Sequence, residues 1–220
     1  MSFSTEKMSW RTKRRNDIIR NMKIGIDIDN VLADSYNAFL ERFNREFGTE
    51  IIYEEVDDFF YLEKYNTVDY HRRVTYVDSL ATDHRFLSSI SPYQEAIAAI
   101  GKWQEIGWMI HYITARPAVT KKTTQNWLKK HGFWGKLTTL DLFPEGKTYA
   151  RDVEYKKDLA DKLGLDVFIE DASAVAKNMK IPVFLLDRPW NKGELPENVT
   201  RVKTWPEIEK GVDHLAKSSL

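Results

Sequence analysis

The stretch KIGIDIDNVLAD, residues 23–34, carries a short apolar run that ends in two aspartates one residue apart. The apolar run predicts a buried strand over residues 23–28. Carboxylates at the end of such a strand cost free energy unless something compensates them. Side chains two residues apart on a strand point the same way, so we expect Asp27 and Asp29 to approach one space. Where the strand has ended that parity weakens, and one of the two then offers its backbone carbonyl instead.

Two carboxylates in one small space favour a hard cation, and its preference for oxygen makes Mg²⁺ the natural candidate. With a metal, the segment suits phosphoryl transfer by an aspartate nucleophile. The alternative is a strand followed by an acidic turn, in which Asp29 or Asn30 merely caps the next element. This segment alone does not decide between the two interpretations.

The composition is that of a globular protein and narrows the function classes. The chain has 220 residues, enough for one α/β domain with an insertion or for two small domains. Lys plus Arg and Asp plus Glu number 33 each, so no global charge points to nucleic acid or to a membrane surface. The lack of cysteine excludes disulfides and thiolate chemistry, and it fits a cytoplasmic location. No apolar run approaches the length of a membrane span, and no signal peptide is recognisable at the N-terminus.

The order of segments predicts a core with an insertion. Residues 1–22 form a basic N-terminal extension, which we interpret as a solvated arm; an arm that contacts nucleic acid is the alternative. Residues 35–90 begin with helical spacing and continue as a segment rich in aromatic and charged residues, which predicts a small helical cap. Residues 23–34 and 91–220 then make up the core.

The rest of the core alternates apolar strands with amphipathic helices. Strands are expected at 108–113, 138–143, 167–169 and 183–186. Between and after them we expect helices from Pro92 to Gly107, from Pro117 to Gly132, over 155–163 and 172–179, and from the capping-box pattern at 204–207 onward. This alternation predicts an α/β fold, a Rossmann-like and mainly parallel sheet with helices on both faces.

Ligands of such sheets bind beyond the carboxyl ends of the strands, where this chain places four polar pairs. They are Asp27 and Asp29, Thr114 and Arg116, Glu170 and Asp171, and Asp187 and Arg188. Phosphoryl transfer needs a nucleophile, a metal, donors for the phosphate oxygens and an acid for the leaving group. We assign Asp27 as the nucleophile and Asp29 as the group that protonates the leaving alkoxide and later deprotonates water.

The remaining pairs supply the other parts. The Thr114 hydroxyl and the backbone N–H groups from Ala115 onward suit phosphate oxygens. The alternative, which is the commoner case for such a threonine taken alone, is a plain helix cap. Lys156 lies near the start of a helix, where a cation makes sense if it faces an anion; a surface lysine is the alternative, and Lys157 leaves the choice open. Asp171 would complete the metal shell.

Two more residues are assigned to the surroundings of the metal. Glu170 is a second acidic group beside Asp171, and Arg116 contacts either phosphate or a carboxylate. For Glu170 and Asp171 a helix-cap role is the alternative.

These motifs resemble those of the haloacid dehalogenase-like superfamily of aspartate-based phosphohydrolases, over roughly residues 23–190. The matching pieces are DIDNVLAD at 27–34, ITARP at 113–117, Lys156, and IED at 169–171. The short insertion and the tail LDRPWN at 186–191 resemble the 5′(3′)-deoxyribonucleotidase branch and its bacterial nucleotidase-like relatives. The resemblance implies Mg²⁺ held by Asp27, by the backbone carbonyl of Asp29 and by Asp171.

The sequence departs from the superfamily pattern at two positions. Asn30 stands where these phosphatases usually have glycine, which bears on the turn that aims Asp29. Glu170 stands where many members have aspartate, which leaves its place in the metal shell open. Asp29 itself argues against the dehalogenase branch, which lacks this second aspartate and needs no metal.

The leading hypothesis is a Mg²⁺-dependent phosphomonoesterase that forms an aspartyl-phosphate and acts on nucleoside monophosphates. Phe59, Phe60, Tyr61 and Trp190 are candidates for stacking a nucleobase, each stack being worth roughly 1–3 kcal/mol; rings that simply hold the cap together are an equal alternative. A second hypothesis is a non-catalytic metal- or phosphate-binding module with a nucleic-acid-contacting arm, and a third is a phosphatase of another small ester or of a polynucleotide end. We expect a small phosphorylated substrate and no membrane or nucleic-acid partner; a homodimer stays open.

Overall fold

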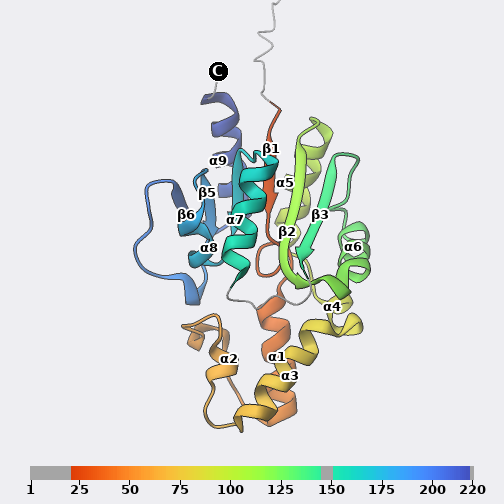
Figure 1. The fold of residues 1–220 in the computed structure, drawn as a ribbon, viewed down its shortest axis with the longest axis vertical. Coiled ribbons are helices and arrows are strands. Elements are labelled where there is room, and N and C mark those ends of the chain that lie inside the picture. Colours follow the sequence, from red (N-terminus) through yellow and green to blue (C-terminus); the bar gives the residue numbers. More distant parts are fainter. Residues whose placement is uncertain (1–20, 145–150, 219–220) are drawn as a thin grey trace, which may run out of the picture.

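The structure, a computed structural model, describes residues 21–144 and 151–218, and its centre is a parallel sheet (Figure 1). The strand order in these residues is β3-β2-β1-β4-β5-β6, with every neighbouring pair parallel. The strands are β1 (Lys23–Ile26), β2 (Met109–Pro117), β3 (Thr138–Phe143), β4 (Val167–Glu170), β5 (Val183–Leu186) and β6 (Val199–Val202). Most of the basic extension lies outside the described residues, but Met22 is buried and its carbonyl accepts a hydrogen bond from Met109 N.

Helices cover both faces of the sheet, as the α/β alternation predicts. One apolar cluster joins the sheet to α5 (Gln94–Glu105), α6 (Lys121–Lys130) and α9 (Trp205–Ser218). A second cluster joins the opposite face to α7 (Asp152–Leu163) and α8 (Ser173–Asn178). Within β4, Val167 and Ile169 belong to the first cluster and Phe168 to the second, the two-residue period of a strand buried on both sides.

None of the described helices combines the length and the apolar character that crossing a membrane requires.

Gly25 lets β1 sit closely beside the second apolar cluster. A Cβ atom at this position would lie 2.4 Å from the Phe168 ring and 2.6 Å from Leu165, so no larger residue fits without displacing the ring. The glycine in KIGI is therefore required for packing, because it lets β1, the strand that leads into Asp27, run through the middle of the sheet.

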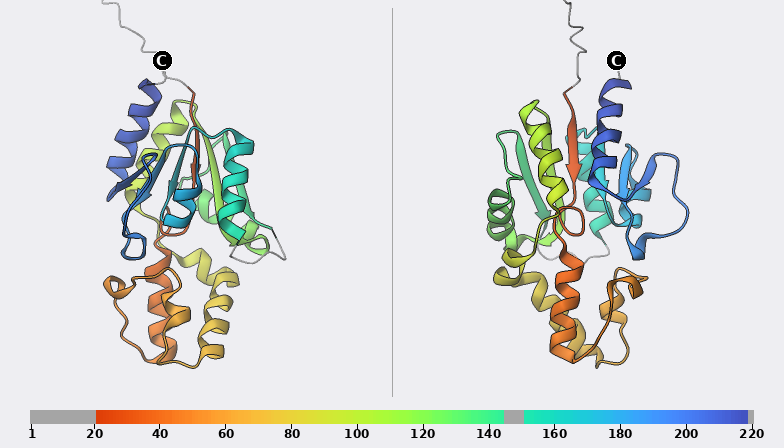
Figure 2. Two further views of the ribbon diagram at one scale, coloured as in Figure 1. Left: turned by 60° about the vertical axis from the view of Figure 1, so that its left-hand side comes forward. Right: turned by 180° about the vertical axis from the view of Figure 1, so that it is seen from behind.

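The segment 35–90, which we call the cap, lies beyond the carboxyl ends of β1, β2 and β3 (Figure 2). It contains α1 (Ser35–Phe47), η1 (Tyr53–Glu55), α2 (Tyr61–Lys64), α3 (Tyr70–Thr82) and α4 (His84–Ser89). Its small core is built mainly from aromatic and aliphatic side chains of α1, α2 and the connecting loop. Trp190 of η4 (Pro189–Asn191), which lies outside the cap, also packs against this cluster.

The two ends of the cap are tied to each other. Asp34 N donates to Ser91 O at 2.9 Å, and Tyr93 N donates to Leu32 O at 2.8 Å. A single bridge pairs Ala33 with the residue after Ser91. The entry to the cap and the exit from it therefore run side by side.

Three elements differ from the expectation. The first strand ends at Ile26, so Asp27 already lies in the loop. The second strand runs on to Pro117, with a register shift between Thr114 and Pro117, and the following helix starts only after the 3₁₀ turn η2 (Ala118–Thr120). The prediction that Pro117 opens the helix was wrong, because a proline at a bulge costs the sheet no hydrogen bond and can end the strand. Strand β6 was missed because its four residues, Val-Thr-Arg-Val, form neither an apolar run nor an alternating pattern.

Candidate active site

Acidic residues from two neighbouring strands meet at the floor of the space beneath the cap. Asp27 follows β1, with its backbone N–H bonded to Ile169 O of β4 at 3.0 Å, and β4 ends in Glu170 and Asp171. One carboxylate oxygen from each of Asp27, Glu170 and Asp171 lies within 4.8 Å of the others, and all three residues are buried. The convergence expected for Asp27 and Asp171 is therefore present, with Glu170 added.

Lys156 supplies a positive charge to this group. Its Nζ atom lies 2.9 Å from Glu170 Oε2 and 3.2 Å from Asp27 Oδ1. Lys156 is 2% exposed, whereas its neighbour Lys157 points to Asp161 on the surface of α7. Of the two lysines that the sequence left open, the structure therefore brings Lys156 to the carboxylates and leaves Lys157 at the surface.

One lysine does not balance three buried carboxylates. Burial raises the pKa of Asp27 well above its ordinary value, against the pull of Lys156, and Glu170 and Asp171 raise it further. Burial and Glu170 likewise raise the pKa of Asp171. Among the described residues, the buried Asp27 Oδ1 makes no hydrogen bond, although Lys156 lies near it. An orphaned carboxylate oxygen within an all-oxygen donor set fits a hard divalent cation.

Asp29 points away from this cluster and toward Arg116. Arg116 Nη2 lies 2.7 Å from Asp29 Oδ1 and Nε lies 2.9 Å from Oδ2, a two-pronged contact, and the Ser35 hydroxyl also donates to Oδ1. Burial raises the pKa of Asp29, but the charge of Arg116 and the hydrogen bonds from Arg116 and Ser35 outweigh it and hold that pKa below its ordinary value. Of the two partners considered for Arg116, this structure shows the carboxylate.

The turn between Asp27 and the cap depends on Asn30. Its φ is +58°, a left-handed conformation in which glycine is favoured and asparagine is tolerated. The departure from glycine therefore preserves the turn. It also adds contacts, since Asn30 Nδ2 donates to Asp171 Oδ2 at 3.2 Å and Oδ1 accepts from Tyr36 N at 2.8 Å. Trp190 Nε1 donates to the same Asp171 oxygen at 3.1 Å.

Glu170 is held by several donors at once. Its Oε2 receives Lys156, and its Oε1 accepts from the backbone N–H groups of Asp171 and Ala172 at 3.1 Å each. With 0% exposure it is fixed in place, and it fixes Lys156 in turn.

Thr114 and Ala115 line the same space from β2. Thr114 is fully buried, and its hydroxyl accepts a hydrogen bond from Arg116 N at 3.2 Å. The expectation that both residues introduce a helix was wrong, because the strand continues past them. The backbone N–H groups near a phosphate would therefore belong to the bulged end of β2 and not to a helix N-terminus.

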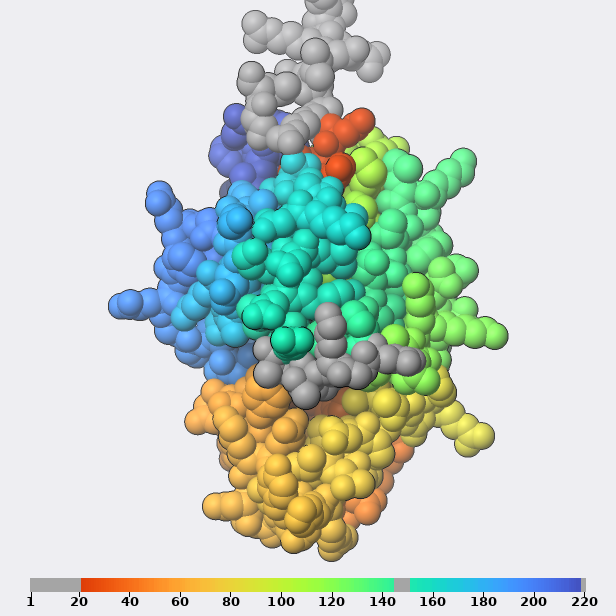
Figure 3. All heavy atoms as spheres, viewed as in Figure 1, coloured from red at the N-terminus to blue at the C-terminus, as the bar shows by residue number. Residues whose placement is uncertain are grey.

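These residues form the floor of a cavity of about 510 Å³ between core and cap. In Figure 3 the orange part of the cap lies directly below the blue residues of the core, and the yellow part lies directly below the green ones. Of the four aromatic residues expected in a substrate pocket, Phe59, Phe60 and Trp190 line the cavity. Tyr61 is not among its lining residues and packs on Tyr65 instead, with ring centroids 6.0 Å apart.

Comparison with known families agrees with this geometry. Residues 20–218 match the family described as 5′ nucleotidase, deoxy (pyrimidine), cytosolic type C protein. The chain belongs to this family. It is therefore a nucleotidase of the haloacid dehalogenase-like type, a hydrolase that acts on phosphomonoesters.

Individual relatives of this nucleotidase are distant in sequence. It is 24% identical to a Halalkalibacterium halodurans protein named "Putative nucleotidase BH1399" over 215 residues, which cover 91% of this chain and 97% of that protein. A "predicted phosphatase" from Clostridium acetobutylicum has the same fold, with a TM-score of 0.63, 14% identity and coverage of 87% and 98%. A "HAD family hydrolase" from Deinococcus radiodurans, solved with bound phosphate and sodium, gives a TM-score of 0.57 at 14% identity, with coverage of 90% and 98%.

Several contacts in the site of this nucleotidase were not foreseen from the sequence. The bridge from Asn30 to Asp171 and Tyr36, the Ser35 bond to Asp29, and the cap carboxylates of Glu63 and Asp78 in the cavity lining are the main ones. Ser35 lies six residues after Asp29, a spacing that a turn can close. No sequence signal marks Glu63 or Asp78, because acidic residues on small helices are usually solvated.

Proposed function

We propose that this chain is a Mg²⁺-dependent 5′-nucleotidase that hydrolyses nucleoside monophosphates through an aspartyl-phosphate on Asp27. The observation that carries the proposal is the buried carboxylate group around Lys156, in which Asp27 Oδ1 accepts no hydrogen bond from the described residues. A carboxylate has two oxygens, so one oxygen of Asp27 could contact a cation while the other attacks phosphorus.

Asp27 and Asp171 would hold the metal, together with the backbone carbonyl of Asp29, and Glu170 lies close enough to contribute. When bound, Mg²⁺ would neutralise charge on the phosphoryl oxygens and keep Asp27 ionised. The raised pKa values of Asp27 and Asp171 support this assignment, since a divalent cation would offset the cause of both shifts.

The other side chains have defined tasks in the proposed reaction. The Thr114 hydroxyl and the Ala115 backbone N–H would bind phosphate oxygens, with Lys156 placed between phosphate and carboxylates. Asp29 is held as a carboxylate by Arg116, which suits the step in which it deprotonates the attacking water. For the first step, in which it protonates the leaving oxygen, Asp29 would first have to take up a proton from solvent, against the pull of Arg116.

The substrate class rests on the cavity and on the family. A space of about 510 Å³ falls within the usual range for small-molecule sites, and Phe59, Phe60 and Trp190 offer ring surfaces to a nucleobase. Among the aromatic contacts, Trp190 packs on Tyr36 with centroids 4.7 Å apart, so part of this surface also holds the cap together.

The test is a panel of nucleoside monophosphates assayed with Mg²⁺ and with EDTA. We expect turnover that needs Mg²⁺ and that falls at least about a thousandfold in Asp27→Asn. Asp158→Asn, an exposed change on α7, is the matched control and should leave turnover unchanged. Turnover indifferent to EDTA or to Asp27→Asn would refute the mechanism, and metal-dependent binding of phosphate without turnover would favour a non-catalytic module.

A further inference from the structure

The cavity has two chemically different ends. The core end carries the carboxylates and Lys156 described above. The cap end is mostly apolar, with Phe39, Phe59, Phe60, Leu62, Val77 and Leu87 in its lining. A phosphate bound on the floor would therefore direct its leaving group toward the cap end.

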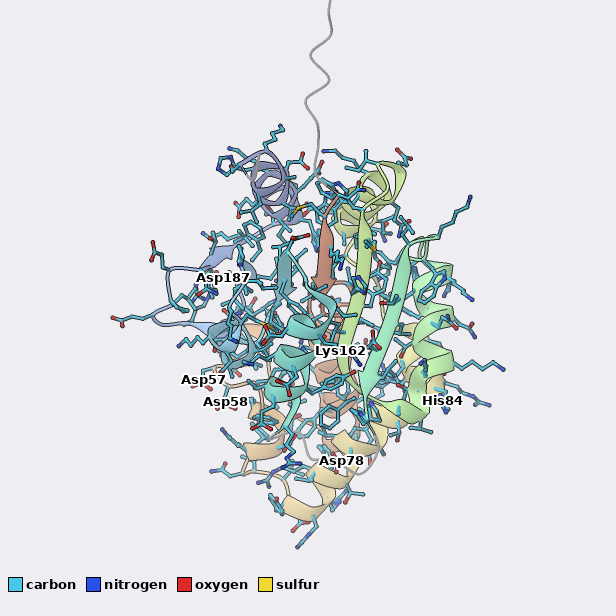
Figure 4. All side chains as sticks on the ribbon, turned by 45° about the horizontal axis from the view of Figure 1, so that its top comes forward. Asp57, Asp58, Asp78, His84, Lys162 and Asp187 are labelled. Atoms are coloured by element: carbon cyan, nitrogen blue, oxygen red, sulfur yellow. The ribbon has the colours of Figure 1, made fainter. Side chains whose placement is uncertain are left out.

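The charged side chains that the cap adds to this lining are both acidic. They are Glu63 on α2 and Asp78 on α3, two helices that pack against each other. Burial raises the pKa of Glu63, and the Asp78 carboxylate raises it further, which places the two groups within electrostatic reach. Figure 4 labels Asp78 on α3, in the lower part of the view.

The basic side chains of α2 and α3 are directed elsewhere. Lys64 pairs with Asp58 at 2.6 Å, and Arg73 donates to backbone carbonyls of the cap. Arg72 lies over the Phe47 ring at 5.5 Å. None of these three lysine and arginine residues lines the cavity.

The basic residues that do line the cavity are already paired. Within residues 21–144 and 151–218 they are Arg116 and Lys156, which hold Asp29 and the carboxylates of the floor. The described lining thus offers no free cation to a second negative group on the substrate. An anionic leaving group would enter an apolar space facing two carboxylates, whereas a neutral or positive one would not be repelled.

We propose that Glu63 and Asp78 select the leaving group by charge, so that this phosphatase accepts esters of neutral or cationic alcohols and rejects esters of anionic ones. The inference rests on the proposed phosphomonoesterase function and adds a specificity-determining pair to it. Nucleosides are neutral alcohols of this kind, and the two carboxylates can accept hydrogen bonds from their N–H and O–H groups. A carboxylate-bearing ester or a nucleoside bisphosphate carries the excluded charge.

The test is a series of small esters that differ in the charge of the alcohol. Phosphoethanolamine, glycerol 3-phosphate and 2-phosphoglycolate release a cationic, a neutral and an anionic alcohol, respectively, and none of them carries a nucleobase. At low ionic strength we expect kcat/KM for 2-phosphoglycolate to be at least about tenfold below that for either of the other two. The gap should narrow in high salt, because Asp78 is exposed.

Variants assign the effect to the two side chains. Asp78→Lys should reverse the preference: the ratio of kcat/KM for 2-phosphoglycolate to that for phosphoethanolamine should rise by well over tenfold, to above one. Glu63→Gln combined with Asp78→Asn should bring this ratio close to one. Asp57→Asn is the control: Asp57 is an exposed cap carboxylate that lies outside the cavity lining, at the left-hand edge of Figure 4. It should leave the ratio unchanged.

The possible outcomes distinguish a failure of charge selection from a failure of the proposed nucleotidase function. If nucleoside monophosphates and phosphoethanolamine are hydrolysed but 2-phosphoglycolate is hydrolysed as fast, or the Asp78→Lys ratio equals that of Asp57→Asn, charge selection is wrong and the nucleotidase proposal stands. If no ester is hydrolysed in Mg²⁺, both are wrong.

Discussion

Replacing Asn30 by glycine and by alanine separates its backbone role from its side-chain role. Both changes remove the hydrogen bond that Asn30 Nδ2 donates to Asp171 and the one that Asn30 Oδ1 accepts from Tyr36 N. At about 1 kcal/mol for each buried hydrogen bond, Asn30→Gly should lower the free energy of unfolding by about 2 kcal/mol. Alanine adds the cost of the left-handed conformation, about 1–2 kcal/mol, partly offset by the more restricted unfolded chain, about 0.4–1 kcal/mol. Asn30→Ala should therefore be less stable than Asn30→Gly by about 1 kcal/mol.

Urea unfolding with linear extrapolation measures these differences, and titration calorimetry with Mg²⁺ measures the effect on the metal site. Both variants take one of two side-chain donors from Asp171 Oδ2, leaving Trp190, so we expect both to bind Mg²⁺ about tenfold more weakly. An alanine variant at least as stable as the glycine variant would refute the backbone argument. Unchanged Mg²⁺ affinity in both would refute the positioning of Asp171 by Asn30.

Three further predictions concern single side chains. Trp190→Phe keeps an aromatic ring but loses the N–H that donates to Asp171, so calorimetry should show Mg²⁺ affinity reduced about tenfold, and the free energy of unfolding should fall by only about 1 kcal/mol. Equal Mg²⁺ affinity would contradict this. Lys156→Met leaves buried carboxylates without their cation and should lower the free energy of unfolding, measured in urea, by about 3–5 kcal/mol. Lys157→Met, at the surface, should leave the unfolding midpoint unchanged. Similar losses of stability in both variants would contradict the different roles given to the two lysines. Burial lowers the pKa of His111, so the unfolded chain binds a proton at this histidine at a higher pH than the folded chain does, and the free energy of unfolding should fall as pH drops below about 6.5. In His111→Gln the free energy of unfolding should depend less steeply on pH. An equally steep dependence in the variant would exclude His111 as its cause.

The strands β1 to β5 were predictable from the sequence, although not their exact ends, because short apolar runs indicate buried strands. Val167-Phe168-Ile169 reads as a strand with both faces covered, and the acidic residues that follow it can lie only at its carboxyl end. The same argument brings Asp27 to Asp171. The convergence of the site thus follows from parallel topology, without any knowledge of side-chain contacts.

The partners of polar side chains could not be predicted in the same way. That Asp29 would face Arg116, and that Asn30 would reach Asp171, depends on turn geometry and rotamers over sequence separations of 87 and 141 residues. The end of β2 was misjudged because a proline is compatible both with a helix start and with a bulge. Choosing between these requires knowing that β3 keeps pairing as far as Phe143.

The cap begins and ends at neighbouring points of the core, because hydrogen bonds join the segment that enters it to the segment that leaves it. Since Leu32 and Tyr93 already hold its ends together, changing the length of the insertion alters the closure entropy by only about 0.6 kcal/mol for each doubling. The cap can therefore gain, lose or exchange whole helices while the carboxylate floor stays folded beneath it. Evolution of such a chain could therefore change the substrate by altering the cap, while the residues that cleave the phosphate ester stay the same.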